Sequence, residues 1–258
     1  MHGLGLNIVV GFAGLLDLGY VAIFAIGGYT VALLTAPTPH GIMMNFWLAL
    51  PIGIAFAALS GILLGIPVLR MRGDYLAIVT LGFGEIIRIL SKSDALTDFT
   101  GGPRGVRAIA GPSIFGMNLS SPISFLFLIM LGIVLVAFVT NRLQHSRVGR
   151  AWMAMREDED VAEAMGIHTL KYKLLAFAIG AAFSGLSGAI FATRLSSIFP
   201  HSFNLLVSIN VLCLIIVGGM GSLPGVVVGS LVLVGMPELL REFAEYRLMI
   251  YGALLIVM

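Results

Sequence analysis

Long runs of apolar residues, separated by short polar stretches, make up most of this sequence. A helix needs roughly 20 apolar residues to cross the hydrocarbon core of a bilayer. Three segments reach about that length without interruption: residues 46–69, 122–140 and 174–195. The pattern therefore predicts three complete membrane-spanning helices. It also predicts a short helix at 75–90 and the beginning of a last helix at 248–258.

Two other apolar stretches, residues 3–35 and 205–240, are interrupted by clusters rich in glycine. The interruptions are GLLDLG at residues 14–19 and GGMGSLPG at residues 218–225. Non-helical backbone inside a bilayer is tolerated only where protein or a water-filled cavity satisfies its N–H and C=O groups. Broken helices at matching places in two halves of a chain are typical of transport sites. The alternative is a kinked, tightly packed helix, and whether 205–240 crosses once or twice stays open.

The composition agrees with a membrane protein that has several spans. Hydrophobic residues make up 59% of the chain and charged residues 11%, and the mean hydropathy is +1.03. These values exclude an ordinary soluble domain, and continuous rather than alternating apolar runs disfavour a β-barrel. We expect an all-α, polytopic transmembrane helical bundle with broken or re-entrant helices, forming a single domain over residues 1–258. Both ends fall inside apolar runs, so the natural chain is expected to be longer.

A charged segment at residues 141–173 interrupts this apolar chain. It holds 11 of the 28 charged side chains, six basic and five acidic. Lys and Arg concentrate in the cytoplasmic loops of membrane proteins, so this loop is predicted to face the cytoplasm. Helix 122–140 then enters from outside, residues 91–121 are external, and Arg70 and Arg72 fall on the inner side.

Within this loop, Glu157 to Met165 is predicted to form a short helix. Four acidic residues, 157–160, fall in its first turn, where the helix dipole favours negative charge. Gly166 follows as a C-terminal cap. Val161, Ala164 and Met165 share one narrow apolar face. We expect the helix to offer that face to a soluble partner. The alternative is a solvated helix at the membrane surface.

Ionisable residues within the apolar segments are candidates for function. Glu85 and Arg88 are spaced to pair on the predicted helix 75–90. We favour a structural pair near the outer interface, and the alternative places Glu85 on a pathway facing a substrate ammonium. Asp17 lies in the first interruption, where it either caps a half-helix or lines the same route.

An intramembrane enzyme is one rival interpretation. Residues 185–188 match the G-x-S-G serine motif of rhomboid proteases, with Ser187 as the nucleophile. A serine nucleophile needs a base within hydrogen-bond reach. The five histidines are expected in loops or at a chain end, namely His2, His40, His145, His168 and His201. Ser187 is therefore better explained as one of the small residues that let helices pack closely.

Eight motifs, in order along the chain, resemble those of branched-chain amino acid ABC permeases. They are GFAGLLDLGY at 11–20, GGYT at 27–30, RGDYLAIVTLGFGEIIR at 72–88, TGGPRG at 100–105, SRVGRAW at 146–152, DVAEAMG at 160–166, YKLLAF at 172–177 and GGMGSLPG at 218–225. They cover nearly the whole chain, and they are most similar to the LivM type of permease subunit.

This resemblance implies a fold like that of the vitamin B12-type (type II) importer permeases and a place in the prokaryotic cytoplasmic (inner) membrane. It implies a LivH-like second permease subunit, two ATP-binding subunits and an extracytoplasmic substrate-binding protein. The chain has no G-x-x-x-x-G-K-[ST] motif, so ATP and Mg²⁺ are expected on the partner subunits. No cofactor, metal site, catalytic residue or nucleic-acid partner is expected on this chain.

The resemblance also makes the loop 141–173 the segment that receives force from the ATPase. The family's E-A-A-x-x-x-G pattern appears in degenerate form, from Asp160 to Gly166. The candidate coupling residues are Glu157, Asp160, Val161, Ala162, Ala164, Met165 and Gly166. The candidate pathway residues are Asp17, Gly19, Glu85, Gly218, Gly219, Gly221 and Ser222. Two alternatives for function stay open: a permease for urea or short amides, and a stand-alone secondary transporter.

Overall fold

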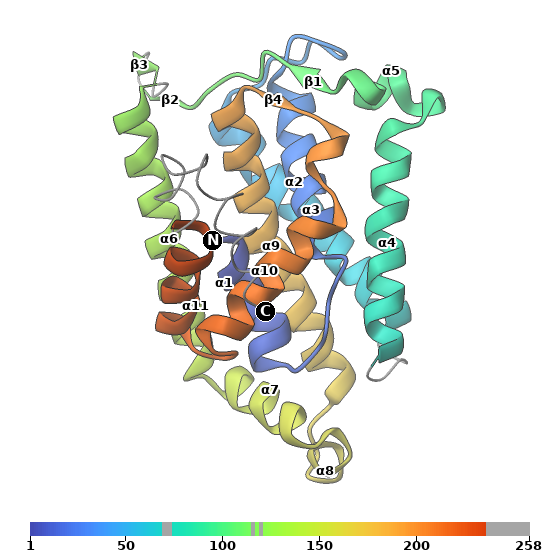
Figure 1. Ribbon diagram of the computed structural model, residues 1–258, viewed down its shortest axis with the longest axis vertical. Coiled ribbons are helices and arrows are strands. Elements are labelled where there is room, and N and C mark those ends of the chain that lie inside the picture. Colours follow the sequence, from blue (N-terminus) through green and yellow to red (C-terminus); the bar gives the residue numbers. More distant parts are fainter. Residues whose placement is uncertain (69–73, 115–116, 119–120, 236–258) are drawn as a thin grey trace, which may run out of the picture.

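Three helices packed side by side form the centre of the computed structural model, which describes residues 1–68, 74–114, 117–118 and 121–235 (Figure 1). They are α2 (Tyr20–Thr35), α3 (Phe46–Val68) and α9 (Thr169–Leu195). Small residues let their backbones approach closely. A β-carbon added to Gly27 of α2 would lie 2.4 Å from the Cα of Gly185 in α9. One added to Gly61 of α3 would lie 2.4 Å from the Cβ of Ala181.

Two further long helices flank this centre: α4 (Asp74–Lys92) and α6 (Pro122–Gln144). The helices predicted at 46–69, 75–90, 122–140 and 174–195 are thus confirmed, with ends that differ by up to five residues. The outward face of α6 is exposed and apolar, with Phe127, Leu131 and Val134 all more than half exposed. In the described residues, four helices are long and apolar enough to cross a membrane: Phe46–Pro67, Pro122–Gln144, Thr169–Leu195 and Pro200–Gly218.

Both predicted helix interruptions are present. The first helix runs as α1 (His2–Leu6) and a π-helical turn η1 (Asn7–Phe12), and the chain is not helical again until α2 begins at Tyr20. The second interruption separates α10 (Leu205–Gly218) from α11 (Leu223–Ser230), which continues as η5 (Leu231–Gly235). Helix α11 packs back against α10, so this stretch turns back on itself at residues 219–222.

The two long connections lie at opposite ends of the molecule (Figure 1). One end carries the segment after α4, together with the connection between α9 and α10. Its elements are η2 (Asp94–Leu96), α5 (Thr97–Thr100), η3 (Gly102–Arg104), β1 (Val106–Arg107), β2 (Ser113–Ile114), β3 (Met117–Asn118), β4 (Ser197–Ile198) and η4 (Pro200–Ser202). Strand β1 pairs antiparallel with β4, and β2 pairs with β3. The other end carries α7 (Arg147–Glu157) and α8 (Glu159–Ala164), as the predicted topology requires.

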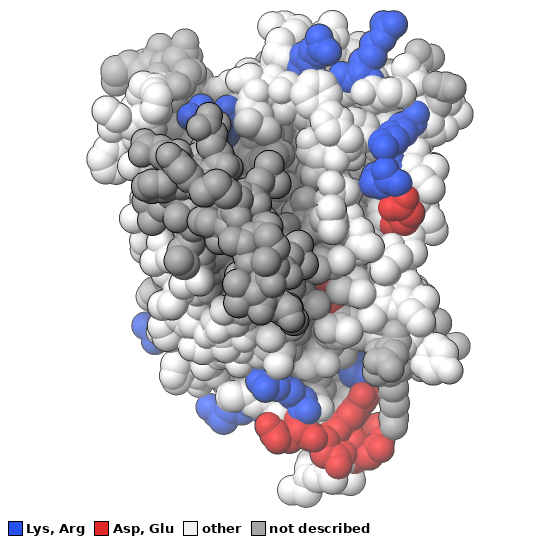
Figure 2. Space-filling model, viewed as in Figure 1, with Lys and Arg blue, Asp and Glu red and all other residues white. Residues whose placement is uncertain are grey.

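Charged side chains on the visible face gather mainly at these two ends (Figure 2). The acidic atoms are densest around α7 and α8, where the chain carries five acidic residues from Glu157 to Glu163. The region between the ends is mostly uncharged, which is the distribution expected of a bundle whose middle lies in lipid. Three predictions fall outside the described residues: the inner placement of Arg70 and Arg72, the helix beginning at 248, and the last part of 205–240.

The predicted surface helix is shorter than expected, and its charges are placed differently. Glu157 ends the preceding helix α7, and Asp158 adopts an extended conformation between the two helices. Asp158 caps α8 because its Oδ1 accepts the N–H groups of Asp160 and Val161 at 2.9 and 3.0 Å. Only Glu159 and Asp160 therefore lie in the first turn. Gly166 follows the helix with a φ of +86°, as predicted for the C-terminal cap.

His2 lies at the chain end, as expected, but it is part of a helix and not of a loop. His2 lies within α1 and packs against the Tyr20 and Phe24 rings, with ring centroids 4.7 Å apart in each case. Its Nδ1 is 3.1 Å from the hydroxyl of Ser184, not of Ser187. Tertiary packing buries this first turn, which sequence position alone did not indicate.

Candidate functional site

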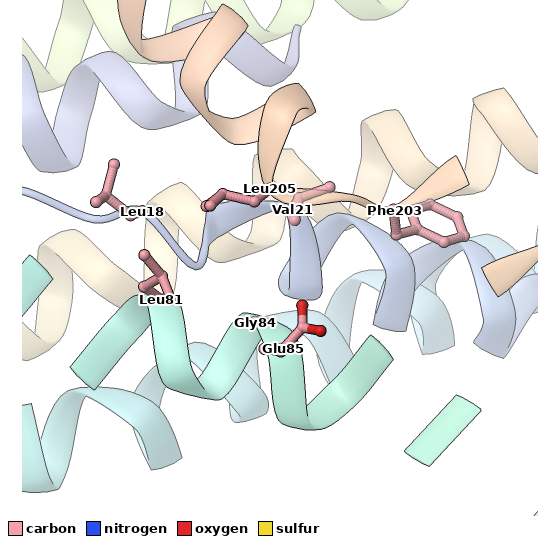
Figure 3. A pocket seen from close by; sticks show the side chains of 7 residues that line it. All are labelled: Leu18, Val21, Leu81, Gly84, Glu85, Phe203 and Leu205. Atoms are coloured by element: carbon pink, nitrogen blue, oxygen red, sulfur yellow. The ribbon is translucent and has the colours of Figure 1, made fainter. Parts of the chain in front are cut away.

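A hollow of about 180 Å³ lies where the first helix break meets α4 and the beginning of α10 (Figure 3). Its lining is apolar except for one carboxylate: Leu18, Val21, Leu81, Gly84, Glu85, Phe203 and Leu205. These residues come from three separate parts of the sequence. The hollow is thus a product of tertiary packing, and the break supplies one of its walls.

Hydrogen bonds hold the break in place beside α4. The Oδ1 of Asp17 accepts the N–H of Gly19 at 2.8 Å, and Gly19 is the N-cap residue that immediately precedes α2. The N–H of Leu18 donates to the hydroxyl of Thr80 at 3.1 Å. Asp17 is fully buried, and its Oδ2 has no hydrogen-bond partner among the described residues. Asp17 thus closes a turn onto Gly19, but α2 has no side-chain cap hydrogen bond, so Asp17 does not cap the half-helix as predicted.

The backbones of the break and of α4 lie so close together that they leave no room for a side chain at Gly19. A β-carbon added to Gly19 would lie 1.9 Å from the carbonyl oxygen of Thr80. One added to Gly84 would lie 3.3 Å from the Cα of Gly19. Gly19 has a φ of −89°, which any residue can adopt, so the lack of space is what demands glycine here. This contact brings Leu18 and Leu81 to the same hollow.

Glu85 and Arg88 form the predicted ion pair. The Nε of Arg88 donates to Oε2 of Glu85 at 2.9 Å, and a second contact joins Nη2 to Oε1. The two side chains remain 27% and 41% exposed, for Arg88 and Glu85 respectively. The carboxylate of Glu85 also borders the hollow and points toward α2 (Figure 3). The pair is therefore both an intrahelical contact and the charged edge of an apolar space.

The second break forms a tight turn rather than part of the hollow. Gly219 and Gly221 have φ values of +94° and +82°, a region that β-branched residues rarely enter. The hydroxyl of Ser222 caps α11 by accepting the N–H of Gly225 at 3.1 Å. A β-carbon on Gly218 would lie 2.1 Å from the carbonyl oxygen of Gly225. Gly218 is thus packed against α11, whereas Gly221 lies against Arg156 and Gly11. None of the four predicted pathway residues of this turn lines the hollow.

Two contacts with α9 anchor the segment α7–α8 to the bundle. Trp152 is fully buried, and its Nε1 donates to the carbonyl oxygen of Tyr172 at 2.8 Å. Lys173 forms an ion pair with Glu159 at 2.5 Å, and the Lys173 side chain is only 6% exposed. These contacts fix the base of the segment against α9.

All three residues of the predicted apolar face are exposed, whereas one predicted coupling residue outside that face, Ala162, is not. Val161 is 57% exposed and Met165 is 79% exposed, and Ala164 is exposed as well. Ala162 is instead buried and belongs to the central hydrophobic core. Ala162 therefore anchors α8, and the surface that a partner can reach consists of Val161, Ala164 and Met165.

Two residues join these regions and were not predicted from the sequence. Arg156, near the end of α7, donates from Nη1 to the carbonyl oxygen of Gly11 at 2.7 Å. Asn7, in η1, accepts the N–H of Gly221 at 2.9 Å. Neither belongs to a periodic pattern. The one available signal was that Asn7 is a lone amide in an apolar run.

The family model and the similar proteins all indicate the same family. The model of the family described as "Branched-chain amino acid transport system / permease component" matches residues 1–258. The chain is 44% identical to the high-affinity branched-chain amino acid transport system permease protein LivM of Escherichia coli, over 99% of this chain and 64% of that protein. It is 25% identical to the permease protein LivH of Salmonella typhimurium, over 98% of this chain and 86% of that protein.

A more distant relative extends this similarity to an archaeal protein. The probable branched-chain amino acid transport permease protein LivM of Methanocaldococcus jannaschii is 25% identical, over 95% of this chain and 74% of that protein. The chain spans 64% of the length of the bacterial LivM proteins that it matches. No solved structure matches it significantly.

Proposed function

This chain belongs to the family of branched-chain amino acid transport system permease components, and from that premise we propose that it is a transmembrane subunit of an ABC importer for branched-chain amino acids. Members of this family are transport permeases and not enzymes. The proposed importer hydrolyses ATP on separate subunits, and this chain forms part of the route through the membrane.

The proposal that ATP hydrolysis drives transport rests on the α7–α8 segment. It projects from one end of the bundle and exposes two large apolar side chains, Val161 and Met165. A buried tryptophan and a nearly buried ion pair hold its base rigid. An exposed apolar face on a rigid support is a typical surface for a helix that docks in a partner's groove. The proposed coupling residues on and around it are Glu157, Asp160, Val161, Ala162, Ala164, Met165 and Gly166.

The hollow beside the first break is the evidence for a substrate with an apolar side chain. Its volume of about 180 Å³ suits a branched aliphatic side chain. It is smaller than the roughly 300–1,000 Å³ of pockets that bury whole ligands. The break that the Asp17–Gly19 hydrogen bond closes forms one wall of this apolar space, and the carboxylate of Glu85, which Arg88 pairs, borders it. We therefore assign Asp17, Gly19 and Glu85 to the proposed pathway.

The role of the second break in the pathway is indirect in this proposal. Gly218, Gly219, Gly221 and Ser222 shape the turn between α10 and α11, and that turn contacts the first helix through Asn7. It therefore affects the route by holding η1 in position. The fold resemblance to type II importer permeases remains a prediction that a solved complex would test.

The proposed assembly contains a LivH-like permease, two ATP-binding subunits and an extracytoplasmic binding protein in the inner membrane of a prokaryote. The similarity of this one chain to both LivM and LivH proteins supports a pair of related permease subunits.

The test is reconstitution of the complete chain with these partners in proteoliposomes. ATP-dependent uptake of radiolabelled leucine, competed by isoleucine and valine but not by urea or acetamide, is expected. Uptake that continues without ATP would indicate a secondary transporter instead. Preferential competition by urea or acetamide would indicate the amide permease. Val161→Asp together with Met165→Asp provides the control that removes the proposed docking surface.

A further inference from the structure

The structure assigns to Arg156 and Asn7 the role of a latch that links the α7–α8 segment to both helix breaks. This inference rests on the proposed function, because a latch of this kind has a use only if α7–α8 receives movement from an ATPase. Arg156 and Asn7 are positioning residues in it, since neither lines the hollow. Each of them holds a backbone group that a broken helix leaves without an intrahelical partner.

Arg156 bonds one backbone group and lies beside two other backbone sites, all far from it in the sequence. Its Nη1 donates to the carbonyl oxygen of Gly11 at 2.7 Å, across 145 residues of sequence. A β-carbon added to Gly14 would lie 3.0 Å from Cγ of Arg156, so the side-chain stem packs against the start of the first break. A β-carbon added to Gly221 would lie 3.1 Å from Nη1. One side chain of α7 thus touches both breaks.

Asn7 completes the connection between the two breaks. Its Oδ1 accepts the N–H of Gly221 at 2.9 Å, and Asn7 itself is fully buried. It lies in the same π-helical turn as Gly11, and its Oδ1 lies beside Gly11, where an added β-carbon would be 2.2 Å away. The three elements α7, η1 and the turn at 219–222 therefore meet at one point.

This arrangement transmits movement because the bonds are short and each has a buried residue of η1 as one partner, Gly11 or Asn7, although Arg156 itself is exposed. The last carbonyl groups of a helix lack intrahelical donors, and a cation near them is favoured by the helix dipole. A buried peptide group that loses its partner is costly, so the turn follows the side chain that satisfies it. When α7 shifts, the carbonyl of Gly11 and the turn at Gly221 are expected to shift with it.

A second reading is that Arg156 only stabilises the C-terminal end of η1. Under that reading, loss of Arg156 lowers the amount of folded complex and reduces ATP hydrolysis and uptake in the same proportion. Under the latch reading, the complex assembles and hydrolyses ATP, but each hydrolysed ATP moves less substrate. The ratio of ATP hydrolysed to leucine transported therefore separates the two.

The experiment compares Arg156→Gln, Asn7→Leu and Arg156→Lys in the complete, reconstituted importer. The first two are expected to lower leucine uptake about tenfold per assembled complex while ATP hydrolysis changes less than about threefold. Arg156→Lys keeps a cationic donor and should recover part of the uptake. Arg150→Gln is the matched control, because Arg150 also lies in α7 but donates within its own loop, to the carbonyl oxygen of His145 at 3.1 Å.

A second measurement does not depend on the substrate. In a Cys213→Ser background, which removes the exposed native thiol, Met220→Cys reports on the turn through its rate of thiol labelling. ATP should change that rate in the otherwise unaltered complex and in Arg150→Gln, but not in Arg156→Gln. Failure of leucine uptake in the unaltered complex, with the ATP-dependent change intact, would overturn the proposed substrate and leave the latch supported.

Either of two results would overturn the latch. One is an unchanged ratio of ATP hydrolysed to leucine transported in both Arg156→Gln and Asn7→Leu. The other is a labelling rate at position 220 that ATP does not change in the unaltered complex, or changes equally in Arg156→Gln.

Discussion

Replacing Gly19 by alanine tests whether the contact between the first break and α4 organises the hollow. The new methyl group would lie 1.9 Å from the carbonyl oxygen of Thr80 and 2.6 Å from its carbonyl carbon. Both atoms belong to the backbone of a helix, so they cannot move aside as the end of a flexible side chain can. The two segments would have to separate by roughly 1 Å to restore an ordinary contact.

The cost has two parts. Overpacking a well-packed site costs about 1–3 kcal/mol, and a rigid backbone neighbour favours the upper part of that range. Separation also stretches the hydrogen bond from the N–H of Leu18 to Thr80, which is 3.1 Å long. A buried donor left unsatisfied adds about 1–3 kcal/mol. We expect a loss of about 3–5 kcal/mol, and so a fall of about 5–15 °C in the apparent melting temperature.

Gly82→Ala is the matched control for this substitution. Gly82 lies in the same helix α4, two residues from Thr80, and a β-carbon added there meets nothing within 4 Å. Alanine in a helix interior is favoured over glycine by about 0.5–1 kcal/mol, so this variant should be as stable as the parent or slightly more. The assays are the monodisperse fraction of solubilised complex after stepwise heating, and ATP-driven leucine uptake per assembled complex.

The expected result is that Gly19→Ala loses both stability and uptake, whereas Gly82→Ala retains both. A Gly19→Ala complex that melts within about 2 °C of Gly82→Ala and transports normally would refute the reasoning. It would mean that the break and α4 can move apart freely, and that the hollow does not depend on their contact.

Three other sets of substitutions test the remaining contacts. Val161→Asp with Met165→Asp should leave the permease inserted but weaken binding of the ATPase, measured by co-purification; normal binding and uptake would exclude α8 as the docking surface. Gly221→Val should abolish leucine uptake, because its φ of +82° excludes a β-branched residue, and full transport by a folded variant would contradict this. Glu85→Gln and Arg88→Gln should each lower the amount of folded complex, and the double variant should recover part of it, since a lone charge next to lipid is worse than none. Competition among amino acids should be unchanged in all three variants of this pair, and a selective loss of affinity in Glu85→Gln would assign the carboxylate to substrate recognition.

Much of the helical framework could be predicted because it depends on local composition. The apolar runs at 46–69, 122–140 and 174–195 each became a helix of similar extent, and both glycine-rich interruptions became real breaks. The Glu85–Arg88 pair was also predictable, since residues three apart on a helix are neighbours. The surface helix was less accurate. Asp158 provides an N-cap within the acidic run and so divides one expected helix from a second, unexpected one.

The sequence by itself determined which segments are helices, where they break, which loop carries the charge and which family the motifs resemble. These properties follow from residues a few positions apart. Only the tertiary structure decided that Gly19 lies on Thr80, that one break borders the hollow while the other packs against Asn7, and that Arg156 reaches both. Each of these contacts joins residues 61 to 214 positions apart. Their partners are backbone groups, which every residue carries alike, so no side-chain pattern in the sequence identifies them.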